Sequence, residues 1–462
     1  MTTQEIFNAE RTPEEVISIL KNKTVTVPAW GKLENEYYAS KHPVMTDPTY
    51  QDRIRKGKTE HVTRITLGWQ KLAAKRMAEL MFGTPVKRIY DPKDEAEKQA
   101  AQLMEAIYQK NKIDSLNLDR AKKLFAACEC VTIWYAQDVP TKYADETSEL
   151  KLRCRTFSPM EGARLYPLFD EYDDLIALSV EHRRTDLVDG KSIAVTYFDT
   201  YTANEHICWK STTGKPQEEI RESINIGKIS GVYIHRPEPV WEDLSGNVYE
   251  AEWTYSRNGN YIRKNSRPTF VIYTDNGVKK GLENTDDNAG RSIIRLGQND
   301  KAEYATWQQA NESIKFHVQE IKHNFFSQLQ LPDMSMDNMK ETPMSGESRK
   351  MLFIDSQMKV TDEGGIWYDM LYREFNVIRE YAKLMFPNYA AAFEALSVKM
   401  QIVPFTIHDE RERVETLGAA VTTNIASRKT AIARLGWVDD VDAEVQQIND
   451  EQTSDLFDEP TV

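Results

Sequence analysis

Two long stretches of helical periodicity dominate the pattern of apolar and polar positions. In the first, residues 304–330, the apolar positions fall at steps of 7, 4, 3, 4 and 4 and are Trp307, Ile314, Val318, Ile321, Phe325 and Leu329. Such spacing places one apolar stripe on a helix of 3.6 residues per turn. The second, residues 345–386, has the same periodicity and ends at Pro387. These helices would be roughly 40 and 60 Å long, and we therefore expect elements that span an assembly.

The segment between them, residues 331–344, is predicted to be a loop because Pro332 and Pro343 exclude a continuous helix. It is rich in methionine, a flexible side chain suited to a surface that meets changing partners; ordinary packing into a core is the alternative. The candidate functional residues of the loop are Met334, Ser335, Met336, Asp337, Asn338, Met339 and Lys340.

Two adjacent glycines, Gly364 and Gly365, interrupt the second periodic stretch. Together they cost roughly 2 kcal/mol relative to alanine in a helix. They mark either a break between two helices or a kink within one, and the sequence leaves both open.

The remaining pattern predicts an α+β fold. Further helices are expected at residues 13–22, 61–82, 95–111, 115–128, 241–266, 408–423 and 428–435 and within the acidic stretch that follows Trp437. Strands are expected at residues 86–90, 130–136, 150–157, 176–182, 192–200, 206–210, 232–235 and 398–404. Two further strands, 269–273 and 292–296, form a small module between helical segments, and we expect this module to project from the body.

Length and charge limit the classes of function that the chain can have. A chain of 462 residues suggests two to four domains. Its net charge of −13 argues against tight, sequence-specific DNA binding, which relies on basic residues. An acidic wall along which DNA slides without sticking remains compatible. No apolar run approaches the ~20 residues that cross a bilayer, and the N-terminus lacks a signal-peptide pattern, so neither a membrane nor a secreted protein is expected.

Motifs for common chemistry are missing. No GxxxxGK[ST], GxGxxG, HExxH or GxSxG string occurs. His317 and His323 are six residues apart and point to different helix faces, and the four cysteines show no metal-ligand spacing. We therefore assign no catalytic residue, cofactor or metal ligand. A metal-dependent nucleic-acid-processing enzyme stays open if Asp173, Asp174 and Asp243 cluster around Mg²⁺.

Four segments together resemble the portal, or head-to-tail connector, proteins of tailed bacteriophages of the small long-tailed type. They are ENEYYASKHPVM at 34–45, HVTRITLGWQKLAAKRMAELMFGTPV at 61–86, QLPDMSMDNM with PMSGESRKMLF between 330 and 353, and the C-terminal IHDERERVETLGAAVTTNIASRKTAIARLGWVDDVDAEVQQINDEQ. No single segment is specific for this family, but the order of the four segments along the chain is.

The resemblance implies a division of the chain. Residues 1–240 would form the wing, 241–266 the first stem helix, 267–300 the clip, 301–330 the second stem helix and 331–344 the tunnel loop. Residues 345–404 would form the long wing helix and a wing strand, 405–455 the crown and 456–462 a disordered tail.

It also implies a function. Such proteins form a dodecameric ring at one capsid vertex of the virion, where double-stranded DNA passes without sequence specificity. The implied partners are the terminase large subunit, the major capsid and scaffolding proteins and the head–tail adaptors, with the clip as docking site through Tyr273, Asp275, Asn276, Lys279 and Lys280. Synthesis in the host cytoplasm follows. A third hypothesis, besides the portal ring and the metal-dependent enzyme, is a monomeric capsid adaptor or scaffold.

Overall fold

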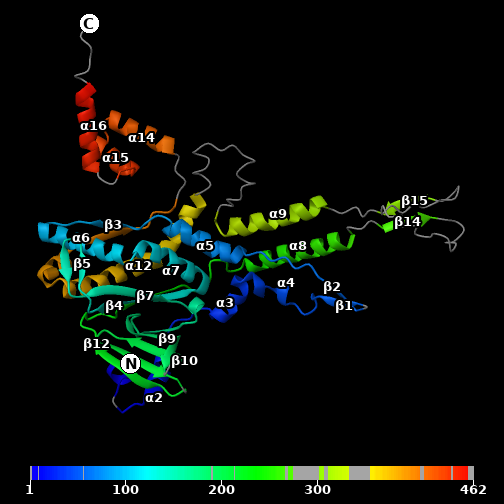
Figure 1. Ribbon diagram of the computed structural model, residues 1–462, viewed down its shortest axis with the longest axis horizontal. Helices are drawn as coiled ribbons and strands as arrows, with labels where there is room; N and C mark the ends of the chain where they lie inside the picture. The colour runs from blue at the N-terminus through cyan, green and yellow to red at the C-terminus, as the bar shows by residue number, and fades with distance from the viewer. Residues whose placement is uncertain are drawn as a thin grey trace, which may run out of the picture.

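The computed structural model describes residues 3–8, 10–55, 57–188, 191–212, 214–265, 269–273, 301–305, 311–331, 354–405, 410–438 and 441–455. Within these ranges a mixed helical and sheet body carries a projecting helical hairpin and a separate group of C-terminal helices (Figure 1). No helix in the described part of the chain is long and apolar enough to cross a membrane.

The body is built around the long helix α12. The helices that surround its core are α5 (Trp69–Phe82), α6 (Glu95–Lys110), α7 (Ile113–Ala127), α12 (Ile354–Met385) and α13 (Ala390–Ala395). Asp94 caps α6 by accepting a hydrogen bond from the Glu97 backbone nitrogen. The core of the body is mostly aliphatic, and the largest fully buried side chains among the described residues are Trp134, Trp241 and Trp367.

Two antiparallel sheets complete the body. The three-stranded sheet has the order β13-β4-β7 and is made of β4 (Glu129–Gln137), β7 (Lys151–Phe157) and β13 (Gly231–His235). The five-stranded sheet has the order β12-β11-β10-β9-β8 and is made of β8 (Arg164–Phe169), β9 (Leu175–Val188), β10 (Lys191–Tyr201), β11 (Glu205–Ser211) and β12 (Gln217–Ser223). The antiparallel β-rich region predicted for residues 150–240 is confirmed.

Several further elements are short. They are α1 (Thr3–Ile6), α2 (Pro13–Leu20), α3 (Trp30–Tyr37), α4 (Pro43–Thr46) and the paired strands β1 (Arg53–Arg55) with β2 (Lys58–Glu60) and β5 (Thr141–Tyr143) with β6 (Glu146–Ser148). Three short 3-10 helices lie at Ala39–Lys41, Pro159–Glu161 and Pro387–Tyr389. The predicted strand at 398–404 is β16 (Val398–Gln401), which pairs with β3 (Lys87–Tyr90) and so joins distant parts of the chain.

The hairpin consists of α8 (Ser245–Asn265) and α9 (Asn311–Gln328), with β14 (Thr269–Tyr273) and β15 (Lys301–Ala305) between them in the sequence. The C-terminal helices are α14 (Glu410–Thr422), α15 (Arg428–Leu435) and α16 (Val441–Asp455). Ser427 caps α15 by accepting a hydrogen bond from the Thr430 backbone nitrogen, so the Ser-x-x-Thr motif is a helix start.

Two predictions about elements are wrong, and one open alternative is decided. The predicted helix 61–82 begins only at Trp69, and residues 61–68 form neither a helix nor a strand. The predicted helix 304–330 begins at Asn311, because residues 301–305 form a strand that pairs with 269–273. The break considered at Gly364 and Gly365 is absent, since α12 runs through both residues. The predicted strand 292–296 and residues 345–353 lie outside the described residues.

Candidate functional site: the projecting hairpin and its anchor

Helices α8 and α9 lie side by side and extend away from the body, with the β14–β15 pair at their far end (Figure 1). The two strands pair from Thr269 opposite Ala305 to Tyr273 opposite Lys301. His317 Nε2 of α9 also lies 3.6 Å from Glu250 Oε1 of α8, and the two form an ion pair when the histidine is protonated. The described part of the predicted module, the β14–β15 pair, therefore projects from the body as the sequence predicts.

Helix α9 has one buried face and one exposed face. The described part of the predicted stripe is confirmed: Val318, Phe325 and Leu329 are buried, and the Phe325 ring lies 5.4 Å from that of Trp69. On the exposed face, Phe316 has 64% of its surface accessible. A large apolar side chain on an otherwise polar face is a candidate for contact with another chain.

The extended segment 61–68 runs along α8 and is held by side chains from successive turns of that helix. The acceptors are Glu252 for the Leu67 nitrogen (2.7 Å), Ser256 for the Ile65 nitrogen (2.8 Å) and Asn260 for the Thr63 nitrogen (2.6 Å). Four helical residues rise about 6 Å and two extended residues about 6.6 Å, so the two repeats match. This match explains why the segment is extended despite its apolar pattern.

Gly259 allows the close approach of this segment. A Cβ atom at that position would lie 2.8 Å from Thr63 Cγ2. Close packing against Thr63 therefore favours a glycine at position 259, and α8 remains helical through it. The helix predicted at residues 241–266 is thus confirmed as α8.

A buried histidine fixes the middle of α8 to the body. His42 Nδ1 lies 2.6 Å from Glu252 Oε1, and its Nε2 lies 2.8 Å from the Glu36 carbonyl oxygen. Burial opposes the charged imidazole, but the hydrogen bonds to Glu252 and to the Glu36 carbonyl outweigh it, so the pKa of His42 is raised. Because His42 and Glu252 are both fully buried, each depends on the other for its charge compensation.

The same N-terminal segment also holds the start of α8. Glu36 Oε2 accepts hydrogen bonds from Trp241 Nε1 at 3.0 Å and from Ser245 Oγ at 2.8 Å. The motif ENEYYASKHPVM thus provides two anchors for the hairpin, Glu36 and His42. Nothing in the sequence marked their partners, because those lie about two hundred residues further along the chain.

A second buried ion pair fixes α12 to the body. Glu374 accepts hydrogen bonds from Arg120 Nη2 (2.6 Å), Arg120 Nη1 (2.9 Å) and Trp134 Nε1 (3.0 Å). Asn117 Oδ1 accepts a further one from Arg120 at 3.0 Å. Both charged side chains are 1% exposed, so α7, β4 and α12 meet at one compensated charge pair.

Only some of the predicted functional residues lie in the described part of the chain. The loop residues 334–340 lie outside the described residues, as do Asp275, Asn276, Lys279 and Lys280. Tyr273 is the last residue of β14, opposite Lys301. Gly364 and Gly365 lie inside α12, where a Cβ at Gly364 would meet the Tyr368 ring at 3.4 Å and one at Gly365 would meet nothing. The kink itself stays a prediction.

The carboxylates proposed for an enzyme are not brought together as a metal site. Asp173 lies in the turn between β8 and β9, and Asp243 lies shortly before α8; both have a positive φ. Among the described residues, no three His, Cys, Asp or Glu side chains are grouped so that they could hold a metal ion. Burial also raises the pKa of the Cys128 and Cys130 thiols, each to about 12, which makes them unreactive.

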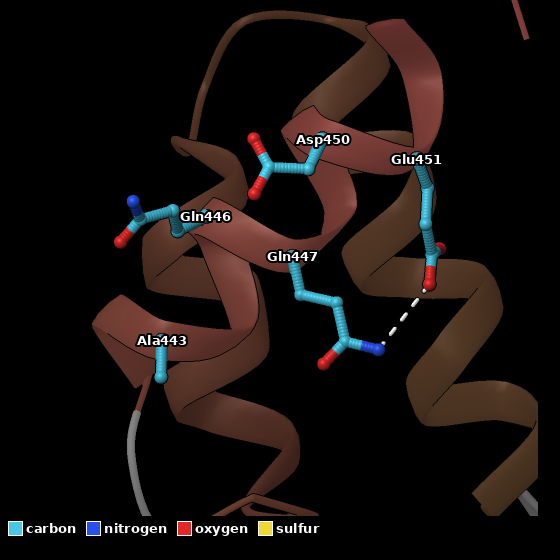
Figure 2. A pocket seen from close by; sticks show the side chains of 5 residues that line it. All are labelled: Ala443, Gln446, Gln447, Asp450 and Glu451. Atoms are coloured by element: carbon cyan, nitrogen blue, oxygen red, sulfur yellow. Dashed lines mark hydrogen bonds between the residues drawn. The ribbon is translucent and has the colours of Figure 1, made fainter. Parts of the chain in front are cut away.

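The C-terminal helices present polar surface. A shallow pocket on α16 is lined by Ala443, Gln446, Gln447, Asp450 and Glu451, all from that one helix (Figure 2). The Gln447 side-chain nitrogen donates to Glu451 Oε1 at 3.2 Å. The pocket draws on a single helical face, and its side chains provide no converging set of ligands.

The sequence matches the family model of phage portal proteins of the SPP1 Gp6-like type over residues 22–455. The chain belongs to this family. Its fold is accordingly the α+β portal fold, and its role is that of a portal, or connector, protein. The predicted family resemblance is thereby confirmed. Phage portal proteins are structural components, and the absence of an enzymatic activity in this chain stays a prediction.

Solved structures give weaker similarity. A chain in the virion of a native gene transfer agent particle has 10% sequence identity and a TM-score of 0.39, covering 91% of the portal chain and 98% of its own length. A chain in the neck of an empty gene transfer agent particle has 9% identity and a TM-score of 0.37, covering 79% and 89%. No curated protein matches the sequence.

Proposed function

We propose that this portal protein forms a closed ring of twelve copies at one capsid vertex and that double-stranded DNA passes through the axial channel. The observation that carries the proposal is the family match over residues 22–455. The projecting α8–α9 hairpin supports it, because a hairpin anchored at its base and exposed along one face suits repetition around an axis.

In this ring, residues 241–266 and 301–330 are the stem, with β15 replacing the first residues of its second helix. Residues 267–300 are the clip, where the terminase large subunit and later the head–tail adaptors dock. Residues 1–240 and 345–404 form the wing, and 405–455 the crown. The capsid and scaffolding proteins surround the ring.

Charge supports passage of DNA without tight binding. Each chain carries −13, so twelve copies form a strongly acidic object. Phosphates are repelled by such a wall, which keeps the friction on moving DNA low. The portal has no catalytic part in this proposal, and the terminase supplies the work. No cluster among the described residues favours a metal-dependent enzyme, and the family match favours a portal over a monomeric adaptor.

A substitution at Phe316 tests the ring contact. Burying a phenylalanine side chain stabilises an interface by about 1.5–3 kcal/mol, and this contribution recurs at every subunit contact. We expect Phe316→Ser to lower the fraction of closed rings in native mass spectra, whereas Phe316→Leu, which keeps an apolar side chain, assembles normally. Equal assembly of both variants would place Phe316 outside the contact.

Deletion of residues 333–342 tests the tunnel loop separately from the ring. We expect the variant to form rings normally but to package or retain less DNA, because the methionine-rich loop would contact the moving duplex. Stable, full heads at the normal yield would remove the loop from the mechanism. The mass of the purified ring provides the control for assembly.

A further inference from the structure

A cleft of about 570 Å³ lies between β7, the Pro159–Glu161 turn, β8 and β9. It is in the part of the molecule near the N-terminus, away from the tip of the hairpin (Figure 1). Three arginines from three strands line it: Arg155 of β7, Arg164 of β8 and Arg183 of β9. In a chain of net charge −13, three guanidinium groups around one cleft require an explanation.

The arginines have no acidic partner among the described residues. The carboxylates of the lining, Glu161 and Glu181, form ion pairs with lysines outside it: Glu161 with Lys123 at 2.8 Å and Glu181 with Lys21 at 3.1 Å. Glu181 also accepts a hydrogen bond from the Tyr166 hydroxyl. Lys21 and Lys123, which Glu161 shares with Asp119, thus compensate the two carboxylates in part, whereas no carboxylate of the described residues pairs with the three guanidinium groups.

Two side chains of the lining are held in place. The guanidinium of Arg155 lies 4.4 Å from the centre of the Phe157 ring, a cation–π contact that restricts its rotamers. His182 packs against Phe157 and Tyr197, and its Nδ1 lies 3.4 Å from Asp199 Oδ2, which is not a hydrogen bond. Burial lowers the pKa of His182; Asp199 opposes this shift, and Arg155 and Arg184 add to it.

We propose that this arginine cleft binds a phosphate group. Guanidinium groups present paired N–H donors that match phosphate oxygens, and they stay charged at every physiological pH. A phosphate offers more acceptor oxygens and more charge than one carboxylate, so it can engage three arginines at once. The phosphate can come from a free phosphate compound or from the backbone of double-stranded DNA, and both present the same chemistry.

The first test is calorimetric titration of inorganic pyrophosphate into the full-length protein. Pyrophosphate should bind the wild type. Arg183 is exposed, and we expect Arg183→Gln to weaken pyrophosphate binding about tenfold, the usual effect of losing one charge-assisted hydrogen bond. The triple variant Arg155→Gln, Arg164→Gln, Arg183→Gln should not bind. Arg153→Gln is the matched control: it removes the same charge from β7 but does not line the cleft.

The second test separates the two sources by fluorescence anisotropy with a labelled DNA duplex. If the duplex binds the wild type and loses affinity in Arg183→Gln but not in Arg153→Gln, the DNA backbone is the ligand. If only pyrophosphate shows this pattern, the ligand is a free phosphate compound. Absence of pyrophosphate binding, or equal binding by the wild type and Arg183→Gln, would overturn the proposal. The titration measures phosphate binding and not ring formation, so a negative result would leave the proposed portal ring untouched.

Discussion

Removal of one partner of the buried Arg120–Glu374 pair should destabilise the body strongly. Glu374→Leu deletes the acceptor of three hydrogen bonds and leaves the guanidinium, which is 1% exposed, without a counter-charge. An uncompensated buried charge of this kind costs about 3–5 kcal/mol. The orphaned Trp134 N–H contributes within that range, since a buried unpaired donor costs about 1–3 kcal/mol.

A double variant tests whether the uncompensated charge of Arg120 or the lost hydrogen bonds cause most of the destabilisation. Arg120→Met with Glu374→Leu removes both charges, so the desolvation penalty disappears and only Trp134 and Asn117 lose partners. We expect the double variant to be more stable than Glu374→Leu by at least about 2 kcal/mol. The matched control is Glu79→Leu at the exposed Lys75–Glu79 pair, where the change should stay below about 1 kcal/mol.

Chemical denaturation followed by tryptophan fluorescence measures these differences, because Trp134 lies in the network itself. The shift in the midpoint, at an unchanged slope, gives the change in free energy of unfolding. The reasoning would be refuted if Glu374→Leu were no less stable than Glu79→Leu, or if the double variant were as unstable as Glu374→Leu.

Two further predictions concern the anchor and the long helix. The folded-state pKa of His42 is raised, so its stabilising effect is fully present below the unfolded value of about 6.5 and is lost as the pH rises through the folded value. Denaturation midpoints should therefore fall across that range in the wild type and not in His42→Gln; parallel curves would count against the anchor. Gly365→Ala should stabilise α12 by about 1 kcal/mol, since the helix is continuous and a Cβ there meets nothing. A lower melting temperature in that variant would show that the glycine conformation is required.

The spacing of apolar residues predicted most elements, because apolar side chains that recur at helix or strand spacing lie on one face, and this face is buried. The stripe through Val318 and Phe325 is on the buried face of α9, and the alternating strands of residues 150–235 form the two sheets. Strand β12 was not predicted because all its residues are exposed, so it has no apolar alternation to detect.

The failures have a common physical origin in long-range partners. Residues 61–68 have apolar positions that also fit a helix, and only the acceptors on α8 decide for an extended chain. Residues 301–305 form a strand because 269–273 lies beside them. The same holds for the candidate sites. The Glu252 partner of His42 and the three arginines of the cleft are far apart or on separate strands, so no local motif marks them.

The native mass of the purified protein tests the central claim most directly. A closed ring of twelve 53.3 kDa chains predicts a single species near 640 kDa by native mass spectrometry or light scattering. A stable dimer or tetramer that does not grow with protein concentration would contradict the portal ring.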